Sequence, residues 1–254
     1  MDRDWVLRTL DTISGFSVGE NGITRLALSD EDLQARKYVI GLMQEIGMTV
    51  RTDSIGNVIG TLAGSDASAS SLIVGSHLDS VPEGGRYDGV LGVVAGLAAI
   101  RRIKSEGMTR RPLELIVFTA EESSRFGYAT MGSKAMAGVA DLKAWSKAKD
   151  SKGVSFMEAL AAAGMEPDKI ETASRVGDAI YAFIELHIEQ GPVLEDEGLS
   201  IGVVEAVAAP TRLKIKVEGN PGHSGTTPMD SRQDALVAAA QVVLAVRDIA
   251  AARY

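Results

Sequence analysis

The sequence of 254 residues contains no cysteine. Disulfide bonds and all mechanisms that use a thiol nucleophile are therefore excluded. No apolar run reaches the roughly 18 residues that a membrane-spanning helix needs. The opening residues, MDRDWVLRTL, also lack the apolar core of a signal peptide. We therefore predict a soluble, cytoplasmic protein that does not interact with a membrane.

The chain also lacks any block of Lys or Arg. Its 26 basic and 34 acidic residues give a net charge of −8, and these charges are spread along the sequence. Nucleic acid and anionic membrane surfaces attract basic patches, so neither is expected as a partner.

Several common catalytic and nucleotide-binding motifs are missing. The glycines of GGRYDGVLG do not fit G-x-G-x-x-G, and there is no Walker A sequence, no G-x-S-x-G and no H-E-x-x-H. Ser224 stands beside His223, but adjacent residues in a loop seldom face each other as a nucleophile and base must.

The apolar pattern alternates between strands and helices. We expect a hairpin over 48–63, strands over 72–75, 113–119 and 180–186, and helices over 30–46, 89–105, 130–137 and 155–163. This order predicts an α/β fold, with a mixed, mostly parallel sheet flanked by helices. The pattern changes near Ala208, after which we expect a half-exposed strand over 213–218 and a long helix over 231–250.

Ionisable side chains follow the three strands at the points where they end. His77 follows the first strand, Glu121 and Glu122 the second, and His187 the third, while Asp88 lies in the Gly-rich loop after the first. A single His at a strand end is more often structural, and a Glu pair is more often a solvated surface. Here, however, two of the chain's three His and a Glu pair share one edge of the sheet, where α/β proteins bind ligands. This grouping favours a metal site for Zn, Mn or Co.

Asp79 stands two residues after His77. A carboxylate at this spacing can accept the proton of the second ring nitrogen and so fix the tautomer of a ligating His. The Glu121-Glu122 pair also suggests that one carboxylate binds metal while the other transfers protons.

Four segments, in order over roughly 72–240, resemble motifs of the M20 metallopeptidase superfamily, and most closely its allantoate amidohydrolase and N-carbamoyl-L-amino-acid hydrolase branch. They are GSHLDSVPEGGRYDGVLGVVAGL, FTAEESSRFG, ELHIEQGPVLEDEG and EGNPGHSGTTPMDSRQDAL. The resemblance implies a metallo-aminopeptidase-like fold and two divalent metal ions. Asp88 would bridge the two ions, His77 and His187 would hold one, and Glu122 would hold the other.

The same resemblance assigns four further roles. Glu121 would be the general base that takes a proton from the attacking water, and Asp79 would orient His77. Gln190 would face the substrate. His223 would reach the substrate, in this family often across a dimer interface.

The resemblance also implies that residues 1–207 are an incomplete catalytic metal-binding domain and that 208–254 begin a small α+β lid and dimerisation domain. Family members continue well beyond this length, form homodimers and carry a late His and a substrate-binding Arg that are not here. We therefore expect the isolated 254-residue chain to be weakly active or inactive.

The segments EESSRFG and VVEAVAAP favour allantoate as the substrate, with release of ammonia. Ureidoglycolate, N-carbamoyl-L-amino acids and β-ureidopropionate remain alternatives. Two other interpretations stay open: an inactive remnant that binds or dimerises, and a peptidase or aminoacylase of the wider superfamily.

Overall fold

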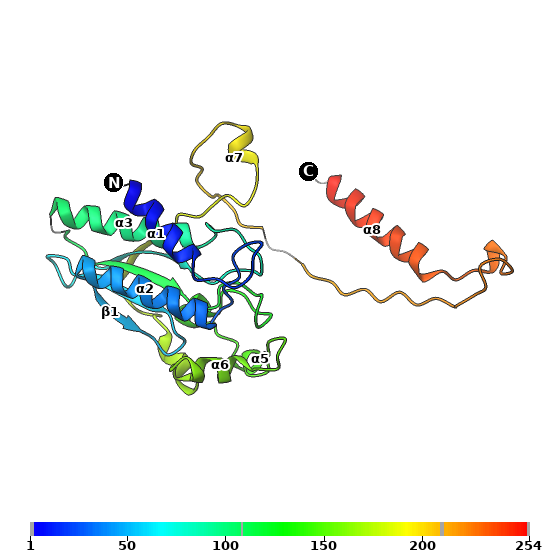
Figure 1. Cartoon of the computed structure of the whole chain (residues 1–254), viewed down its shortest axis with the longest axis horizontal. Helices are drawn as coiled ribbons and strands as arrows, with labels where there is room; N and C mark the ends of the chain where they lie inside the picture. Colours follow the sequence, from blue (N-terminus) through cyan, green and yellow to red (C-terminus); the bar gives the residue numbers. More distant parts are fainter. Residues whose placement is uncertain (1–2, 108, 209–210, 253–254) are drawn as a thin grey trace. The chain divides into compact units, whose positions relative to one another are not determined.

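The computed structural model describes residues 3–107, 109–208 and 211–252. The chain forms two compact units, Met1–Val193 and Leu194–Tyr254 (Figure 1). Among the described residues, no helix combines the length and the apolarity needed to cross a bilayer.

The first unit is built on a five-stranded sheet with the order β1-β2-β4-β3-β5. Strands β1 and β2 form an antiparallel hairpin, and β2 pairs antiparallel with β4. Strand β3 pairs parallel with both β4 and β5. The strands are β1 (Thr49–Thr52), β2 (Val58–Leu62), β3 (Ser71–His77), β4 (Leu113–Phe118) and β5 (Ile180–Ile184). The predicted mixed sheet flanked by helices is confirmed.

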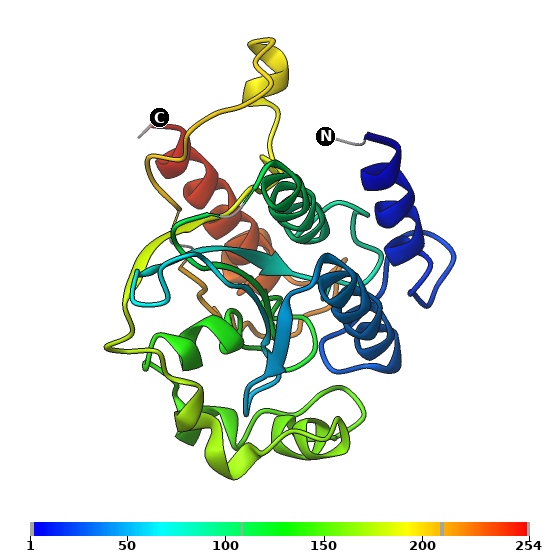
Figure 2. The same cartoon turned by 90° about the vertical axis from the view of Figure 1, so that its left-hand side faces the viewer.

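Helices cover both faces of this sheet (Figure 2). On one face lie α1 (Arg3–Ser14), α2 (Asp30–Ile46) and α3 (Val90–Glu106). On the other lie α4 (Met131–Met136), α5 (Leu142–Trp145), α6 (Phe156–Ala162) and the 3-10 helix η1 (Pro167–Ala173). Alternate residues of β4 serve the two faces: Leu115 and Val117 join the core under the first set of helices, whereas Ile116 packs with Met136 of α4.

Local signals explain two of the helix starts. Ser29 caps α2 by accepting a hydrogen bond from the backbone N–H of Asp32. At α6, Ser155 and Glu158 form a reciprocal capping box.

The second unit differs from the sequence expectation. The segment 213–218 forms no strand, and its apolar residues Leu213 and Ile215 are exposed. Alternation produces a strand only where a neighbouring strand satisfies the backbone N–H and C=O groups, and the described part of this unit contains no such neighbour.

The predicted long helix is present, but it begins later than expected. Helix α8 spans Ala235–Ala251, because the Asp234 side chain caps it by accepting from the backbone N–H groups of Leu236 and Val237. A short 3-10 helix, η2 (Met229–Ser231), precedes it, and α7 (Val193–Asp196) lies where the two units meet in the sequence. The domain boundary at 207/208 and the roles given to the two parts stay predictions.

Candidate metal centre

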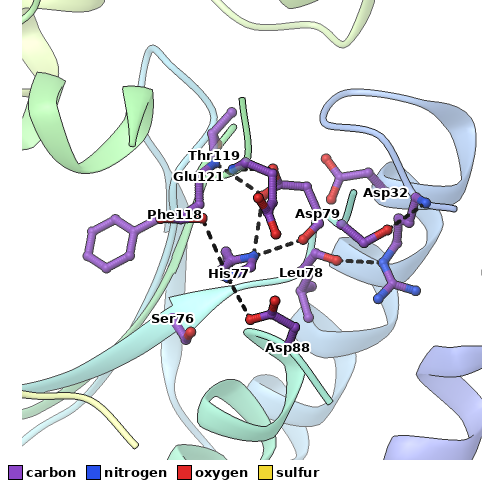
Figure 3. A network of polar contacts seen from close by, with 12 residues as sticks. Asp32, Ser76, His77, Leu78, Asp79, Asp88, Phe118, Thr119 and Glu121 are labelled. Atoms are coloured by element: carbon purple, nitrogen blue, oxygen red, sulfur yellow. Dashed lines mark hydrogen bonds and ion pairs between the residues drawn. The ribbon is translucent and has the colours of Figure 1, made fainter. Parts of the chain in front are cut away.

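The site lies at the carboxyl ends of three neighbouring strands. His77 is the last residue of β3, Glu121 and Glu122 follow β4, and His187 follows β5. Because β3 runs parallel to both neighbours, the three strands end at the same edge. Asp88, in the loop before α3, turns its carboxylate toward His77 (Figure 3). The sequence therefore predicted this convergence from the order of strands and side chains.

The two histidines present the nitrogen that a metal would bind. His77 Nδ1 lies 2.8 Å from the backbone oxygen of Asp79, and His187 Nδ1 lies 2.8 Å from that of Ile188. A carbonyl oxygen can only accept, so Nδ1 must carry the proton in both rings. In the neutral rings, both Nε2 atoms are therefore left with a free lone pair, and both face Asp88.

The Asp88 carboxylate is the point on which these lone pairs converge. Its Oδ1 lies 3.1 Å from His187 Nε2 and 3.9 Å from His77 Nε2. This oxygen is buried and accepts no hydrogen bond. Acceptor atoms that face each other without a proton repel, and a cation between them removes the repulsion. The donor set of His77, Asp88 and His187 thus fits a divalent metal.

A second group of possible ligands includes both glutamates. One donor atom each from His77, Glu121 and Glu122 lies within 4.8 Å of the others, and Glu121 Oε2 is 3.7 Å from His77 Nε2. The resemblance paired Glu122 with Asp88 instead, and that pairing stays a prediction. The carboxylate and imidazole donors of this second group also fit Zn, Mn or Co.

Asp79 contacts His77 as predicted, but through a different atom. The hydrogen bond to His77 Nδ1 comes from the backbone oxygen, while carboxylate Oδ1 is 3.8 Å away. The carboxylate instead accepts the backbone N–H groups of Glu121, at 3.3 Å, and Glu122, at 2.9 Å. Asp79 therefore fixes both the His77 ring and the turn that carries the two glutamates.

Burial and the charges of neighbouring groups shift the pKa values at this edge. Burial raises the pKa of Asp79 to about 6, although the His77 ring opposes the shift. Burial also raises the pKa of Glu122 to about 7, with Glu121 and Asp88 adding repulsion. Burial disfavours the charged form of His77, but the surrounding carboxylates outweigh it and raise the pKa of this ring.

These shifts predict that metal binding weakens in mild acid. Below pH 7, Glu122 carries a proton that a metal must displace, and His77 gains a proton as well. We expect the apparent affinity for Zn²⁺ to fall by about tenfold or more between pH 7.5 and 6, because ligands must be deprotonated to bind. Calorimetric titration at the two pH values measures this, with circular dichroism confirming that the fold persists. An affinity that stays constant over this range would contradict the pKa assignments.

The two predicted substrate-binding residues lie in different units. Gln190 Nε2 donates to Asp88 Oδ2 at 2.8 Å, so this side chain reaches the metal centre. His223 lies in the second unit, where its Nδ1 accepts from the N–H groups of Gly225 and Thr226. The substrate-binding roles of Gln190 and His223 stay predictions.

Sequence reasoning missed three buried polar residues that hold the strand ends. Arg25 Nε donates to the backbone oxygen of Leu78, and Arg36 Nη2 donates to that of Phe118. Asn57 accepts from the backbone N–H of Thr119. No local pattern marks these side chains, because each acts on a segment more than fifty residues away.

Comparison with known proteins matches residues 73–251 to Peptidase family M20/M25/M40. Ureidoglycolate hydrolase of Oryza sativa subsp. japonica is 44% identical over 251 residues, covering 97% of this chain and 52% of the relative. N-carbamoyl-L-amino acid amidohydrolase of Geobacillus stearothermophilus is 40% identical over 228 residues, covering 89% and 56%. Allantoate deiminase of Arabidopsis thaliana is 32% identical over 252 residues, covering 97% and 48%.

Solved structures agree with these relatives. The crystal structure of AtUAH in complex with (S)-hydroxyglycine superimposes with a TM-score of 0.83 at 41% identity, covering 97% of this chain and 60% of that one. The chain spans about half the length of the curated relatives that it matches.

Proposed function

The chain belongs to Peptidase family M20/M25/M40, and we propose that the protein is a two-metal amidohydrolase that cleaves a C–N bond of a small linear ureido acid. The observation that carries this proposal is the convergence of two imidazole lone pairs on the buried, unpaired Oδ1 of Asp88. In this scheme His77, His187 and Asp88 would hold one divalent ion, and Asp88 and Glu122 would hold the other.

Two bound metal ions would polarise the ureido carbonyl and make an attacking water more acidic. Glu121, beside His77 and partly open to solvent, takes the proton from that water and passes it to the leaving nitrogen. Asp79 accepts the N–H groups of Glu121 and Glu122 and so keeps both carboxylates in place during the proton transfer. Gln190 is hydrogen-bonded to Asp88, and its side-chain amide can contact the substrate at the same edge of the sheet.

The relatives support a ureido acid and favour some candidates over others. Identity is 44% to the ureidoglycolate hydrolase, 40% to the N-carbamoyl-L-amino acid amidohydrolase and 32% to the allantoate deiminase. We therefore propose ureidoglycolate or an N-carbamoyl-L-amino acid as the substrate in preference to allantoate. The sequence motifs alone had favoured allantoate. We also propose that the metal is Zn, Mn or Co, that the full-length protein forms a homodimer, and that it is cytoplasmic.

The test uses protein expressed from its native gene and loaded in turn with Zn²⁺, Mn²⁺ or Co²⁺. We expect two ions per chain and ammonia release from at least one of ureidoglycolate, N-carbamoyl-L-amino acids, β-ureidopropionate and allantoate. Hydrolysis of N-acetyl amino acids alone would instead indicate a peptidase or aminoacylase. Metal binding without turnover of any of these compounds would favour a remnant that binds or dimerises.

A further inference from the structure

The turn that carries Glu121 and Glu122 is held against a second segment of the chain. Residues 119–121 run beside residues 130–132, and three backbone hydrogen bonds of 2.7–3.0 Å join them. The donors are the N–H groups of Thr130, Met131 and Gly132. Phe118 and Thr119 lead directly from the sheet into this turn (Figure 3). The position of the glutamates therefore depends on how firmly these two segments are joined.

Both segments contain a residue in an unfavourable backbone conformation. Ala120 has φ +49° and Thr130 has φ +57°, in the left-handed region that residues other than glycine seldom adopt. Such conformations persist only where the surrounding contacts over-determine them, and they relax when those contacts are lost. The turn is thus under strain immediately before Glu121.

Asn57 is the side chain that joins the two segments. Its Oδ1 accepts from the N–H of Thr119 at 2.9 Å, and its Nδ2 donates to the backbone oxygen of Gly132 at 3.1 Å. Asp53 holds the Asn57 amide in place, because its Oδ2 accepts a hydrogen bond from the same Nδ2 at 2.8 Å. Asn57 is fully buried, so no water can replace these bonds from the surface.

The fit around this amide leaves no spare room. A Cβ atom on Gly132 would lie 2.1 Å from Asn57 Oδ1 and 2.6 Å from the backbone nitrogen of Thr119. Only glycine allows the second segment to approach the amide this closely. Asn57 forms hydrogen bonds with Asp53, Thr119 and Gly132 and with neither Glu121 nor Glu122, so we expect its effect on the glutamates to pass through the backbone of the turn.

We propose that Asn57 is a positioning residue that sets the Glu121–Glu122 side of the metal centre by holding residues 119 and 132 together. This inference rests on the proposed two-metal function. Asn57 acts on the ion bound by Glu122 and on the proton transfer by Glu121. It does not act on the ion held by His77 and His187.

The test measures the two metal affinities of the protein expressed from its native gene by calorimetric titration with Zn²⁺. We expect Asn57→Ala to weaken one of the two affinities by about 10- to 100-fold, the usual effect of removing a group that supports metal ligands, and to leave the other within about threefold. In a Glu122→Gln background, Asn57→Ala should change the remaining affinity by less than about threefold, because the ion that Asn57 supports is already lost with its Glu122 ligand.

Arg175→Ala provides the matched control. Arg175 donates to both carboxylate oxygens of Glu114 at the opposite end of β4, and both side chains are largely buried. This variant loses a buried polar contact on the same strand, so its Tm should fall while both metal affinities persist. If Asn57→Ala does not fold, Asn57→Ser replaces it in the same titrations. We again expect one of the two affinities to weaken and the other to persist.

Three results separate the possibilities. Failure of the wild-type protein expressed from its native gene to bind two ions refutes the proposed function and, with it, the inference. If the wild type binds two ions and Asn57→Ala lowers both affinities equally, Asn57 merely stabilises the fold. Positioning by Asn57 requires that Asn57→Ala lowers only one of the two affinities. It also requires that the same substitution has no such effect in the Glu122→Gln background.

Discussion

A Glu121→Gln variant is expected to bind both metal ions but to lose about 100- to 10,000-fold in kcat, the usual contribution of a general base. Gln keeps the size and the polar contacts of Glu but cannot accept a proton. Since Glu121 Oε2 stands 3.7 Å from His77 Nε2 at the edge of the centre, its loss should affect proton transfer rather than the fold. KM should change little, because the interaction is made only as the water attacks.

The measurement is ammonia release at saturating ureido acid, together with a metal titration of the same sample. Glu122→Gln is the informative neighbour, because it should lose affinity for one ion and activity together. Glu106→Gln, on the exposed end of α3, is the neutral control. Full turnover in Glu121→Gln would show that another group removes the proton and would overturn the base assignment.

The grouping of the candidate ligands could be predicted because it depends on order along the chain. Each ionisable residue follows an apolar run, and parallel strands bring such positions to one edge. His77, Glu121 and His187 satisfy this rule without any knowledge of side-chain packing. Asp88 could be placed nearby because its loop must return from the end of β3 to the start of α3.

The atoms that make the contacts could not be predicted. The spacing of His77 and Asp79 indicated a contact, but the local backbone turns a carbonyl, and not the carboxylate, toward the ring. The role of Asn57 offered no signal, because the two segments that it joins, at Thr119 and Gly132, lie 62 and 75 residues further along the chain. Side-chain hydrogen bonds between distant segments are fixed only when the whole fold is assembled.

The strand predicted over 213–218 was wrong for a related reason. Leu213, Ile215 and their neighbours alternate as an exposed strand would, but alternation describes one chain while a strand requires two. Helix α8 needed no partner to form, because an α-helix satisfies its own backbone groups. The sequence therefore predicted this helix and failed on the segment before it.

A Gly89→Ala variant is expected to disrupt the metal centre through the addition of a single methyl group. Gly89 has φ +66°, where an L-residue costs about 1–3 kcal/mol of strain. Its Cβ atom would also lie 2.5 Å from both Cε1 and Nε2 of His77. The ring is 2% exposed and is fixed by its Nδ1 hydrogen bond, so it can move only by losing that bond.

We expect the affinity for the ion at His77 to fall by about 100-fold, the upper range for changes beside a metal ligand, as measured by titration with Zn²⁺. Gly85→Ala is the matched control in the same loop, because a Cβ atom there meets nothing within 4 Å and φ is unstrained. Wild-type affinity in Gly89→Ala would mean that the ring can turn away from Asp88 without cost. In that case His77 Nε2 would not be a ligand, and the buried oxygen of Asp88 would need another partner.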